Sequence, residues 1–279
     1  MKYLFRNRIA DDRMLATFLK DSSDTHPDHH DYHPHYELYF RRHALPQDIT
    51  LNGVCRQIQG PAIVLTAPFQ IHAMSPTNAD CPRYERHIVY FNQRLIDTLC
   101  DGLLPRSFIT ENANVLFPLT EQIADQLEQA LPTLFDSTLP ERERVLAFGL
   151  LLARLDRLVP TEMRQHFGQI NAYIPQVLQY LYDHVSKDLT TEQIAARFHV
   201  SRAKLNRDFR TSVGQSLHAA VMDLRFSAAK TLLVDSNRSV GDIAAACGFS
   251  SEYYFHAFFK RMTDCTPLGW RKRHSDPNF

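Results

Sequence analysis

Five side chains in the N-terminal part of the chain have types and spacing that could do chemistry together. They are His33, His35, Glu37, Tyr39 and His72. Successive side chains of a strand point to opposite faces, so a strand over residues 33–40 would place the first four on one face. Imidazole, carboxylate and phenol groups can hydrogen-bond the hydroxyl groups of a sugar, and imidazoles with a carboxylate can also bind a divalent metal.

Three interpretations of these residues stay open. A pocket for a small organic effector is the favoured one. A structural or surface role is the second, because further histidines and aspartates make residues 24–35 strongly polar, as expected of a solvated loop. A metal site is the third.

The elements that would carry these residues are short strands. Apolar or alternating runs are separated by glycines and prolines, which is typical of strands joined by turns. Closely spaced short strands predict a sandwich or a barrel over about the first 110 residues. The runs include residues 36–40, Ile58, residues 62–66 and residues 87–91.

Two helical patterns follow, at residues 119–135 and 140–158. The second is apolar on more than one face, so it is expected either to pack in the core of its own subunit or to pair with another subunit. Residues 159–168 are short and polar, with a proline and a glycine near the ends, and they predict a hinge. A further helix is expected over residues 173–185.

The most specific pattern lies near the C-terminus, where a short helix, a glycine and a second helix follow one another. Gly248 would end the first helix in the left-handed conformation, and Ser250 or Ser251 would cap the second. This order is typical of a helix-turn-helix motif. The expected buried stripe of the second helix is Tyr254 or Phe255, Phe258 and Phe259, and its outward residues are Glu252, Tyr253, His256, Ala257 and Lys260.

A second copy of this pattern lies upstream, over residues 190–214. Thr190 and Gln193 predict a capping box at its first helix. A repeated apolar frame with different outward residues is what two DNA-reading units would need. The matches are Ile194-Ala195-Ala196 with Ile243-Ala244-Ala245 and Ser201 with Ser250, then, one residue further apart, Leu205 with Phe255 and Phe209 with Phe259.

Residues 215–235, between the copies, predict a single helix. About 20 helical residues span roughly 30 Å, close to the ~34 Å between successive major grooves on one face of DNA. From residue 171 onward the chain has 14 Lys and Arg against 10 Asp and Glu, although its total net charge is zero, and this excess suits a polyanion. The residues at helical spacing are Leu217, Val221, Leu224, Ala228 and Leu232.

The five cysteines are scattered and odd in number, so they predict neither a disulfide framework nor a metal site. No apolar run reaches the ~18 residues of a membrane helix, and the first residues lack the apolar core of a signal peptide. We therefore expect reduced thiols and a cytoplasmic location, with a cysteine-based redox sensor as the alternative. The cysteines are Cys55, Cys81, Cys100, Cys247 and Cys265.

Over about residues 172–273 the chain resembles the DNA-binding domain of the AraC/XylS family of bacterial transcription regulators. Asp264 stands where that family usually has glycine, but aspartate tolerates left-handed geometry, so the turn is expected to survive. The residues that carry the resemblance include Ile194-Ala195, Val200-Ser201, Gly214, Leu224-Arg225, Ile243-Ala244, Gly248-Phe249, Tyr254-Phe255, Phe259-Lys260, Thr266-Pro267 and Trp270-Arg271.

The N-terminal half resembles the cupin-like jelly roll that binds a small effector in the same family. The resemblance implies an all-β jelly roll followed by helices, and an all-α domain in which a linker helix joins two helix-turn-helix motifs. Residues 1–160 would bind the effector and dimerise, and residues 171–279 would bind DNA. Enzymatic cupins place their glutamate several residues after the second histidine, whereas Glu37 follows His35 by two. We therefore expect no catalytic residue, metal or cofactor.

The resemblance also implies which residues read DNA. Arginine pairs well with guanine and asparagine with adenine, so the first motif is expected to discriminate sequence and the second to position the domain. Lys260, together with Arg210, Arg261, Arg271 and Lys272, is expected either to contact phosphate or to be a solvated charge, and not to read bases. The implied reading face of the first motif is Ala203, Asn206 and Arg207, with Arg202 and Lys204 beside it, and that of the second motif is Glu252, Tyr253, His256 and Ala257.

The expected function is an effector-responsive, non-enzymatic, sequence-specific transcription regulator of genes for carbohydrate or small-metabolite use. Its expected partners are promoter DNA, a sugar-like effector, RNA polymerase and a second copy of the chain. A metal-dependent cupin enzyme and a metal- or redox-sensing regulator are the alternatives. A DNA-repair methyltransferase would need a reactive cysteine in its own local signature, and none is recognisable.

Overall fold

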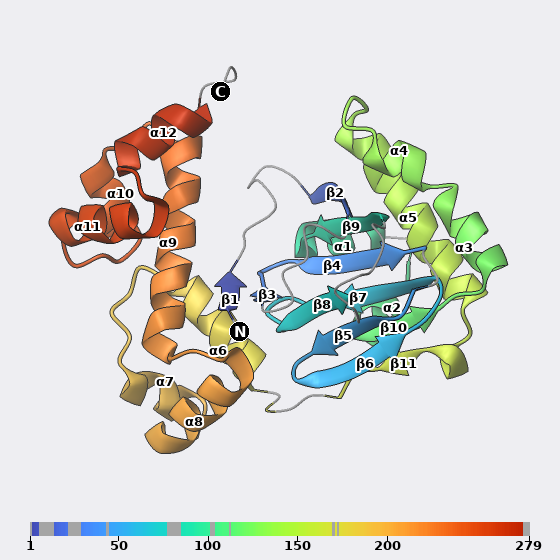
Figure 1. Cartoon of the computed structure of the whole chain (residues 1–279), viewed down its shortest axis with the longest axis horizontal. Coiled ribbons are helices and arrows are strands. Elements are labelled where there is room, and N and C mark those ends of the chain that lie inside the picture. Colours follow the sequence, from blue (N-terminus) through green and yellow to red (C-terminus); the bar gives the residue numbers. More distant parts are fainter. Residues whose placement is uncertain are drawn as a thin grey trace. The chain divides into compact units, whose positions relative to one another are not determined.

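A computed structural model describes residues 2–5, 14–21, 29–42, 45–76, 85–100, 104–111, 113–168, 171 and 173–275 (Figure 1). Contacts divide the chain into two compact units, formed mainly by Arg6–Ala172 and by Tyr173–Phe279. Each unit has its own core and is described by itself.

The described strands form two antiparallel sheets. One has the strand order β1-β3-β8-β5-β6 and the other β11-β10-β7-β4-β9-β2. The strands are β1 (Lys2–Phe5), β2 (Leu15–Asp21), β3 (His29–Tyr32), β4 (Tyr36–Arg41), β5 (Gln47–Leu51), β6 (Val54–Ile58), β7 (Ala62–Thr66), β8 (His72–Pro76), β9 (Glu85–Phe91), β10 (Val115–Pro118) and β11 (Gln165–His166).

Alternation along β4 divides the unit into two cores. Leu38 and Phe40 point to one face of the six-stranded sheet, where helices cover them. Tyr39 points to the other face and packs with Ile49 and Leu51 of the five-stranded sheet. Neighbouring β7 and β9 follow the same alternation, so residues opposite Glu37, Tyr39 and Arg41 also lie between the sheets.

The described residues of the first unit also form five α-helices. They are α1 (Gln93–Cys100), α2 (Arg106–Glu111), α3 (Glu121–Glu128), α4 (Leu131–Phe135) and α5 (Glu141–Leu158). The expected long helix over residues 119–135 is two short ones, α3 and α4. Helix α5 buries Phe148, Leu151 and Leu155 in the core but leaves Leu146 60% and Leu150 47% exposed.

Residues 159–168, which were expected to form the hinge, are instead attached to the first unit. They include a 3-10 turn (Thr161–Met163) and β11, which pairs with β10. Phe167 is buried in the core between the sheets, and Arg164 forms an ion pair with Asp156 at 2.8 Å. The prediction of a hinge at this place is wrong, because these contacts hold the segment.

From Tyr173 onward, the described residues of the second unit form helices joined by short turns. Its helices are α6 (Ile174–Asp183), α7 (Thr191–Arg197), α8 (Arg202–Val213), α9 (Leu217–Asp235), α10 (Val240–Ala246), α11 (Glu252–Thr263) and α12 (Pro267–Ser275). Helices α7 and α8 form one helix-turn-helix, and α10 and α11 form the other. The prediction of an all-β domain followed by helices and an all-α domain with two such motifs is confirmed.

Local sequence explains how these helices begin and end. Thr190 and Gln193 form the expected capping box of α7. Ser201 caps α8 and Ser251 caps α11, so the expected match of Ser201 with Ser250 is one residue off: the second turn contains one extra residue. Asp264 ends α11 at φ 57°, in the left-handed region, as expected.

Helix α9 is shared by both motifs. Of the five residues expected on its buried stripe, Leu217 and Leu224 are buried, but Val221, Ala228 and Leu232 are only half-buried. The prediction of one stripe was too narrow, because α9 contacts α6 and α8 with one part of its surface and α10 and α12 with another. Its buried residues also include Met222, Phe226, Ala229 and Leu233.

Two arginines make equivalent contacts in the two motifs. Arg225 of α9 donates to the carbonyl oxygens of Val185 and Lys187 at 3.1 and 3.0 Å. Arg271 of α12 donates to the carbonyl oxygens of Leu233 and Arg238 at 2.9 and 2.6 Å. Each satisfies carbonyls at or just beyond the C-terminus of a preceding helix, so both arginines link the helices of their motif.

Two further expectations concern cysteines and membranes. Cys55, Cys100, Cys247 and Cys265 are free thiols, and Cys81 lies outside the described residues. Burial raises the pKa of the Cys247 thiol to about 11. Among the helices that the structure describes, none has the length and apolar character needed to cross a bilayer.

Candidate effector site and nucleic-acid interface

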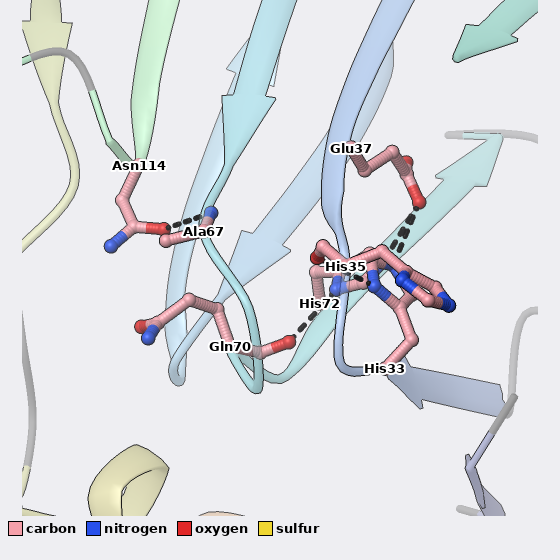
Figure 2. A network of polar contacts seen from close by, with 7 residues as sticks. All are labelled: His33, His35, Glu37, Ala67, Gln70, His72 and Asn114. Atoms are coloured by element: carbon pink, nitrogen blue, oxygen red, sulfur yellow. Dashed lines mark hydrogen bonds and ion pairs between the residues drawn. The ribbon is translucent and has the colours of Figure 1, made fainter. Parts of the chain in front are cut away.

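His33, Glu37 and His72 meet in the interior of the first unit. Glu37 comes from β4 of the six-stranded sheet, His72 from β8 of the facing sheet, and His33 from the bend between β3 and β4. Nε2 of His33 and of His72 lie 3.1 and 3.3 Å from Oε2 of Glu37, and all three side chains are buried. Figure 2 shows the two rings converging on the carboxylate.

Backbone carbonyls hold both rings in this orientation. Nδ1 of His33 lies 2.9 Å from the carbonyl oxygen of His35, and Nδ1 of His72 lies 2.9 Å from that of Gln70. A neutral imidazole has only one N–H, so His33 cannot donate to both its carbonyl and Glu37. When His33 is neutral, one of its two contacts therefore lacks a hydrogen-bond donor, and we call this the donor deficit of His33. The deficit disappears if both rings are protonated or if a bound group takes the place of a proton.

Burial and ionic contacts shift the pKa values of these three groups in opposite directions. Burial would raise the pKa of Glu37, but His72 and His33 hold it well below 4.5. Burial would lower the pKa of His72, but Glu37 raises it to about 9. Burial lowers the pKa of His33 despite its contact with Glu37. The free cluster is thus an ion pair of Glu37 and His72 beside a neutral His33.

His35 and Tyr39 lie apart from this contact. The strand begins at Tyr36 rather than at residue 33, so His35 lies in the preceding bend, with its ring centroid 6.2 Å from that of His33. Burial lowers the pKa of His35 to about 3. Tyr39 is deeper between the sheets and donates to Oε1 of Gln47 at 2.9 Å. The expectation of a single strand face carrying all four residues is wrong at its N-terminal half.

Two residues of this region were missed from the sequence. Thr66 lies opposite Glu37 on β7, and its buried hydroxyl has no hydrogen-bond partner among the described residues. Tyr90 lies opposite Glu37 on β9, and its ring contacts that of His33 edge-on at 5.0 Å. Both sit in apolar runs, and only the strand pairing shows that they face the cluster.

The cluster has the donor set of a metal site. The three ligand atoms of His33, Glu37 and His72 all lie within 4.8 Å of one another. Two imidazoles and a carboxylate suit divalent transition metals such as zinc or iron. Carbonyl contacts at Nδ1 are also the usual way in which ligand histidines are oriented. The residues present therefore fit a metal ion, although a polar organic ligand could use the same groups.

The first recognition helix, α8, presents most of its expected reading face to solvent. Arg202, Ala203, Asn206 and Arg207 are exposed, and Leu205 and Phe209 are buried beneath them. Arg202 pairs with Glu192 of α7 at 2.5 Å, and because both side chains are mostly exposed, this pair is weak. Asn206, Arg207 and Arg210 line a shallow groove of about 530 Å³ with Thr211 and Ser216.

A buried carboxylate, which the sequence did not reveal, organises the cations of α8. Asp208 accepts a hydrogen bond from the Tyr173 hydroxyl at 2.9 Å and pairs with Lys204, and its Oδ1 lies 3.4 Å from Nε of Arg207. Its hydrogen bond with Lys204 keeps the pKa of Asp208 below its usual value. Lys204 is thus partly neutralised, whereas the side chain of Arg207 remains 71% exposed.

The second recognition helix, α11, has a less basic face. Glu252, Ala257 and Lys260 are exposed, Tyr253 is 85% exposed, and His256 is half-buried with Nε2 at 3.7 Å from Oε1 of Glu252. Phe255, Phe258 and Phe259 form the buried stripe, so of the two alternatives for its first position Phe255 is correct. This face offers fewer strong donors to bases than α8 does.

Comparisons with known proteins agree with this architecture. A helix-turn-helix domain model matches residues 194–273. The xylose operon regulatory protein of Escherichia coli K12 is 30% identical over 101 residues, 36% of this chain, which spans only 26% of that protein. The transcriptional activator RhaS of Citrobacter koseri is 27% identical over 252 residues, 88% of this chain and 86% of RhaS.

A solved structure shows the same overall fold. An apo variant of ToxT from Vibrio cholerae aligns with 96% of this chain and 100% of its own, with a TM-score of 0.50 and 13% identity.

Two helix-turn-helix motifs joined by a shared helix, in one chain with a separate β-domain, define a two-domain regulator of the helix-turn-helix class. Within that class, residues 194–273 match the helix-turn-helix domain model, and most of the chain is similar to the transcriptional activator RhaS.

Proposed function

We propose that the protein is an effector-responsive activator that binds promoter DNA through α8 and α11. The observation that carries this proposal is the pair of capped recognition helices, each with an exposed polar face, joined by one helix. The 19 residues of α9 correspond to about 28 Å, which suits two helices in successive major grooves on one face of DNA. The protein would act in the cytoplasm together with RNA polymerase.

We further propose that the space around His33, Glu37 and His72 receives a small polyhydroxylated metabolite. The ion pair offers both a donor and an acceptor, and the unpartnered hydroxyl of Thr66 lies opposite Glu37. Buried polar groups of this kind gain stability when a ligand hydroxyl completes their hydrogen bonds. A relative that controls a xylose operon supports a sugar as the chemical class.

Dimerisation through α5 is part of the proposal. Leu146 and Leu150 lie one turn apart on this helix and are the large apolar residues that it exposes. A second copy of the chain that covers both with its own α5 would bury them symmetrically.

The DNA-binding proposal is tested with Arg207→Ala and Lys260→Ala in the full chain and in residues 171–279. Arg207→Ala should weaken binding to the cognate site by about 1–3 kcal/mol and relax its base preference, because an arginine on the reading face can pair with guanine. Lys260→Ala should weaken cognate and random DNA equally. Binding-site selection and salt titration measure both effects.

The two variants control for each other, since each removes one exposed cation from a recognition helix. Unmodified protein should bind DNA with an affinity that falls steeply as salt rises. An Arg207→Ala protein that selects the same sequence as the unmodified protein would contradict the assignment of Arg207 as a base-reading residue. Folded protein that binds no DNA at low salt would contradict the function itself.

A metal-responsive regulator is the second candidate. The geometry of His33, Glu37 and His72 favours it, because a divalent metal at the Nε2 atoms would remove the donor deficit of His33. In that case the metal would be held by the two imidazoles and the carboxylate, and it would supply the signal rather than a reaction.

Metal removal distinguishes the two candidates. If a metal is resident, the purified chain should contain about one equivalent, and chelation should lower the melting temperature of the first unit in the unmodified protein but not in His72→Gln. Calorimetry and elemental analysis measure both quantities. His166→Gln is the control, because His166 is exposed on β11. Full metal-free stability with no response to zinc or iron would exclude the candidate.

A further inference from the structure

Two arginines lie side by side between the sheets, at the opposite end of β4 from Glu37. Arg41 is the last residue of β4 and Arg86 is its direct partner on β9. Arg41 reaches toward the five-stranded sheet, because it donates to Oε1 of Gln47 at 3.2 Å and to the carbonyl oxygen of Ile58 at 3.4 Å. Directly opposite residues project to the same face, so both guanidinium groups enter the space between the sheets.

Both side chains are buried, and their environments differ. Arg41 is 0% and Arg86 4% exposed. Arg41 has several acceptors, including the carbonyl oxygen of Leu45. In the part of the chain that the structure describes, Nε and Nη1 of Arg86 are shielded from solvent and have no acceptor.

This arrangement is costly for a free protein. A buried guanidinium without hydrogen bonds loses its hydration and gains nothing in return. Two cations directly opposite on neighbouring strands also repel each other. An oxyanion between the two arginines would remove both costs, because guanidinium groups donate two parallel hydrogen bonds to a carboxylate or a phosphate.

The arginine pair is separate from the histidine cluster. Four residues of strand separate Glu37 from Arg41, about 13 Å along β4. Tyr39, Val64 and Ile88 occupy the middle of the same face and belong to the apolar core. The hydroxyl of Tyr39 and the amide of Gln47 meet at the arginine end of this core.

We propose that Arg41 and Arg86 form an oxyanion subsite of their own, apart from the histidine cluster, for an acidic metabolite such as a sugar acid or a sugar phosphate. The subsite rests on the proposed effector function of the first unit and adds to it a second place, at which a charged ligand binds. Gln47 positions Arg41, and the unpartnered edge of Arg86 receives the anion.

The test compares three ligands that share one ring, namely glucose, glucuronate and glucose 6-phosphate, by calorimetric titration of the full chain. Glucuronate, glucose 6-phosphate or both should bind at least about tenfold more tightly than glucose. Tighter binding of glucuronate would indicate a carboxylate ligand, and tighter binding of glucose 6-phosphate would indicate a phosphate ligand. Arg86→Met should abolish this preference, and it should raise the melting temperature of the ligand-free protein, because it removes an uncompensated buried charge.

Arg42→Met is the matched control. Arg42 is the next residue along the chain, but it is partly exposed and pairs with Glu121, Asp125 and Glu128. The Arg42→Met variant should still bind the acidic ligands more tightly than glucose. Binding of neither acid above glucose, an unchanged preference in Arg86→Met, or a loss of ligand-free stability in Arg86→Met would each overturn the subsite. Promoter binding by the same preparations is measured in parallel: if it is intact, only the subsite has failed, and if it is lost in unmodified protein, the proposed function has failed.

Discussion

Gly248→Ala is expected to unfold the DNA-binding unit under conditions in which the unmodified protein is stable. Gly248 has φ +78°, and a Cβ there would lie 2.8 Å from the carbonyl oxygen of Val185 and 2.9 Å from Nε of Arg225. The left-handed backbone costs an alanine about 1–2 kcal/mol, and the overlap adds about 1–3 kcal/mol. We expect a total loss of roughly 2–5 kcal/mol, with loss of DNA binding at 37 °C.

The only tryptophan, Trp270, lies in the second unit, so its fluorescence during urea unfolding follows this unit specifically. Gly60→Ala is the matched control: Gly60 has φ +76°, but a Cβ there meets no atom within 4 Å. Gly60→Ala should therefore lose only the stability that the left-handed backbone costs an alanine. Because Gly60 lies in the first unit, calorimetry of that unit measures this loss. Equal losses in the two variants would show that the close approach to Val185 and Arg225 costs nothing.

Glu37→Gln is expected to have the largest effect in the first unit. It leaves the buried, charged His72 without its counter-ion, and breaking a buried pair in this way costs about 2–4 kcal/mol even where an amide keeps some hydrogen bonding. Chelator-treated full-length protein should therefore show a lower first-unit transition by calorimetry. The effector response should be lost, whereas residues 171–279 should bind DNA unchanged.

The effect should depend on pH in a defined direction. The folded-state pKa of His72 is raised from 6.5 to about 9, so its contribution is fully present below pH 6.5 and is lost as the pH rises through about 9. The folded-state pKa of Glu37 is depressed, so its contribution is present above pH 4.5 and is lost as the pH falls through the depressed value. The difference in stability between the unmodified protein and Glu37→Gln should thus be greatest between pH 4.5 and 6.5.

Glu121→Gln makes the same chemical change at an exposed carboxylate that pairs with Arg42 at 3.1 Å. It should cost less than about 1 kcal/mol at any pH, because water screens an exposed pair. If Glu37→Gln is no more destabilising than this control, Glu37 and His72 do not form a buried ion pair in solution.

The sequence alone predicted the helix-turn-helix frame well because each feature depended on neighbouring residues. The Thr190 capping box, the stop at Gly248 and the turn at Asp264 are all set by local backbone chemistry. The histidine cluster was half predicted: alternation correctly placed Glu37 on an inward face, but the bend before Tyr36 could not be seen in a run of polar and aromatic residues.

The remaining features depend on pairing between distant segments. The role of Arg86 can be inferred only from its position opposite Arg41, and that of Thr66 only from its position opposite Glu37. Asp208 looked like an ordinary polar residue of a solvated helix, because its partner Tyr173 is 35 residues away. The buried surface of α9 was underestimated for a related reason, since one helix serves two sets of neighbours.

The sharing of α9 also bears on how the DNA-binding unit folds. Leu224 and Ala220 are buried in the first part of the helix, and Phe226, Ala229 and Leu233 are buried in the core of the second motif. Neither motif can therefore melt without exposing apolar surface that belongs to the same helix. The two motifs should form one cooperative folding unit, in which damage to either abolishes both. A population with one working recognition helix and one unfolded would then be negligible, and the protein in a cell would be either fully competent to bind DNA or open to degradation.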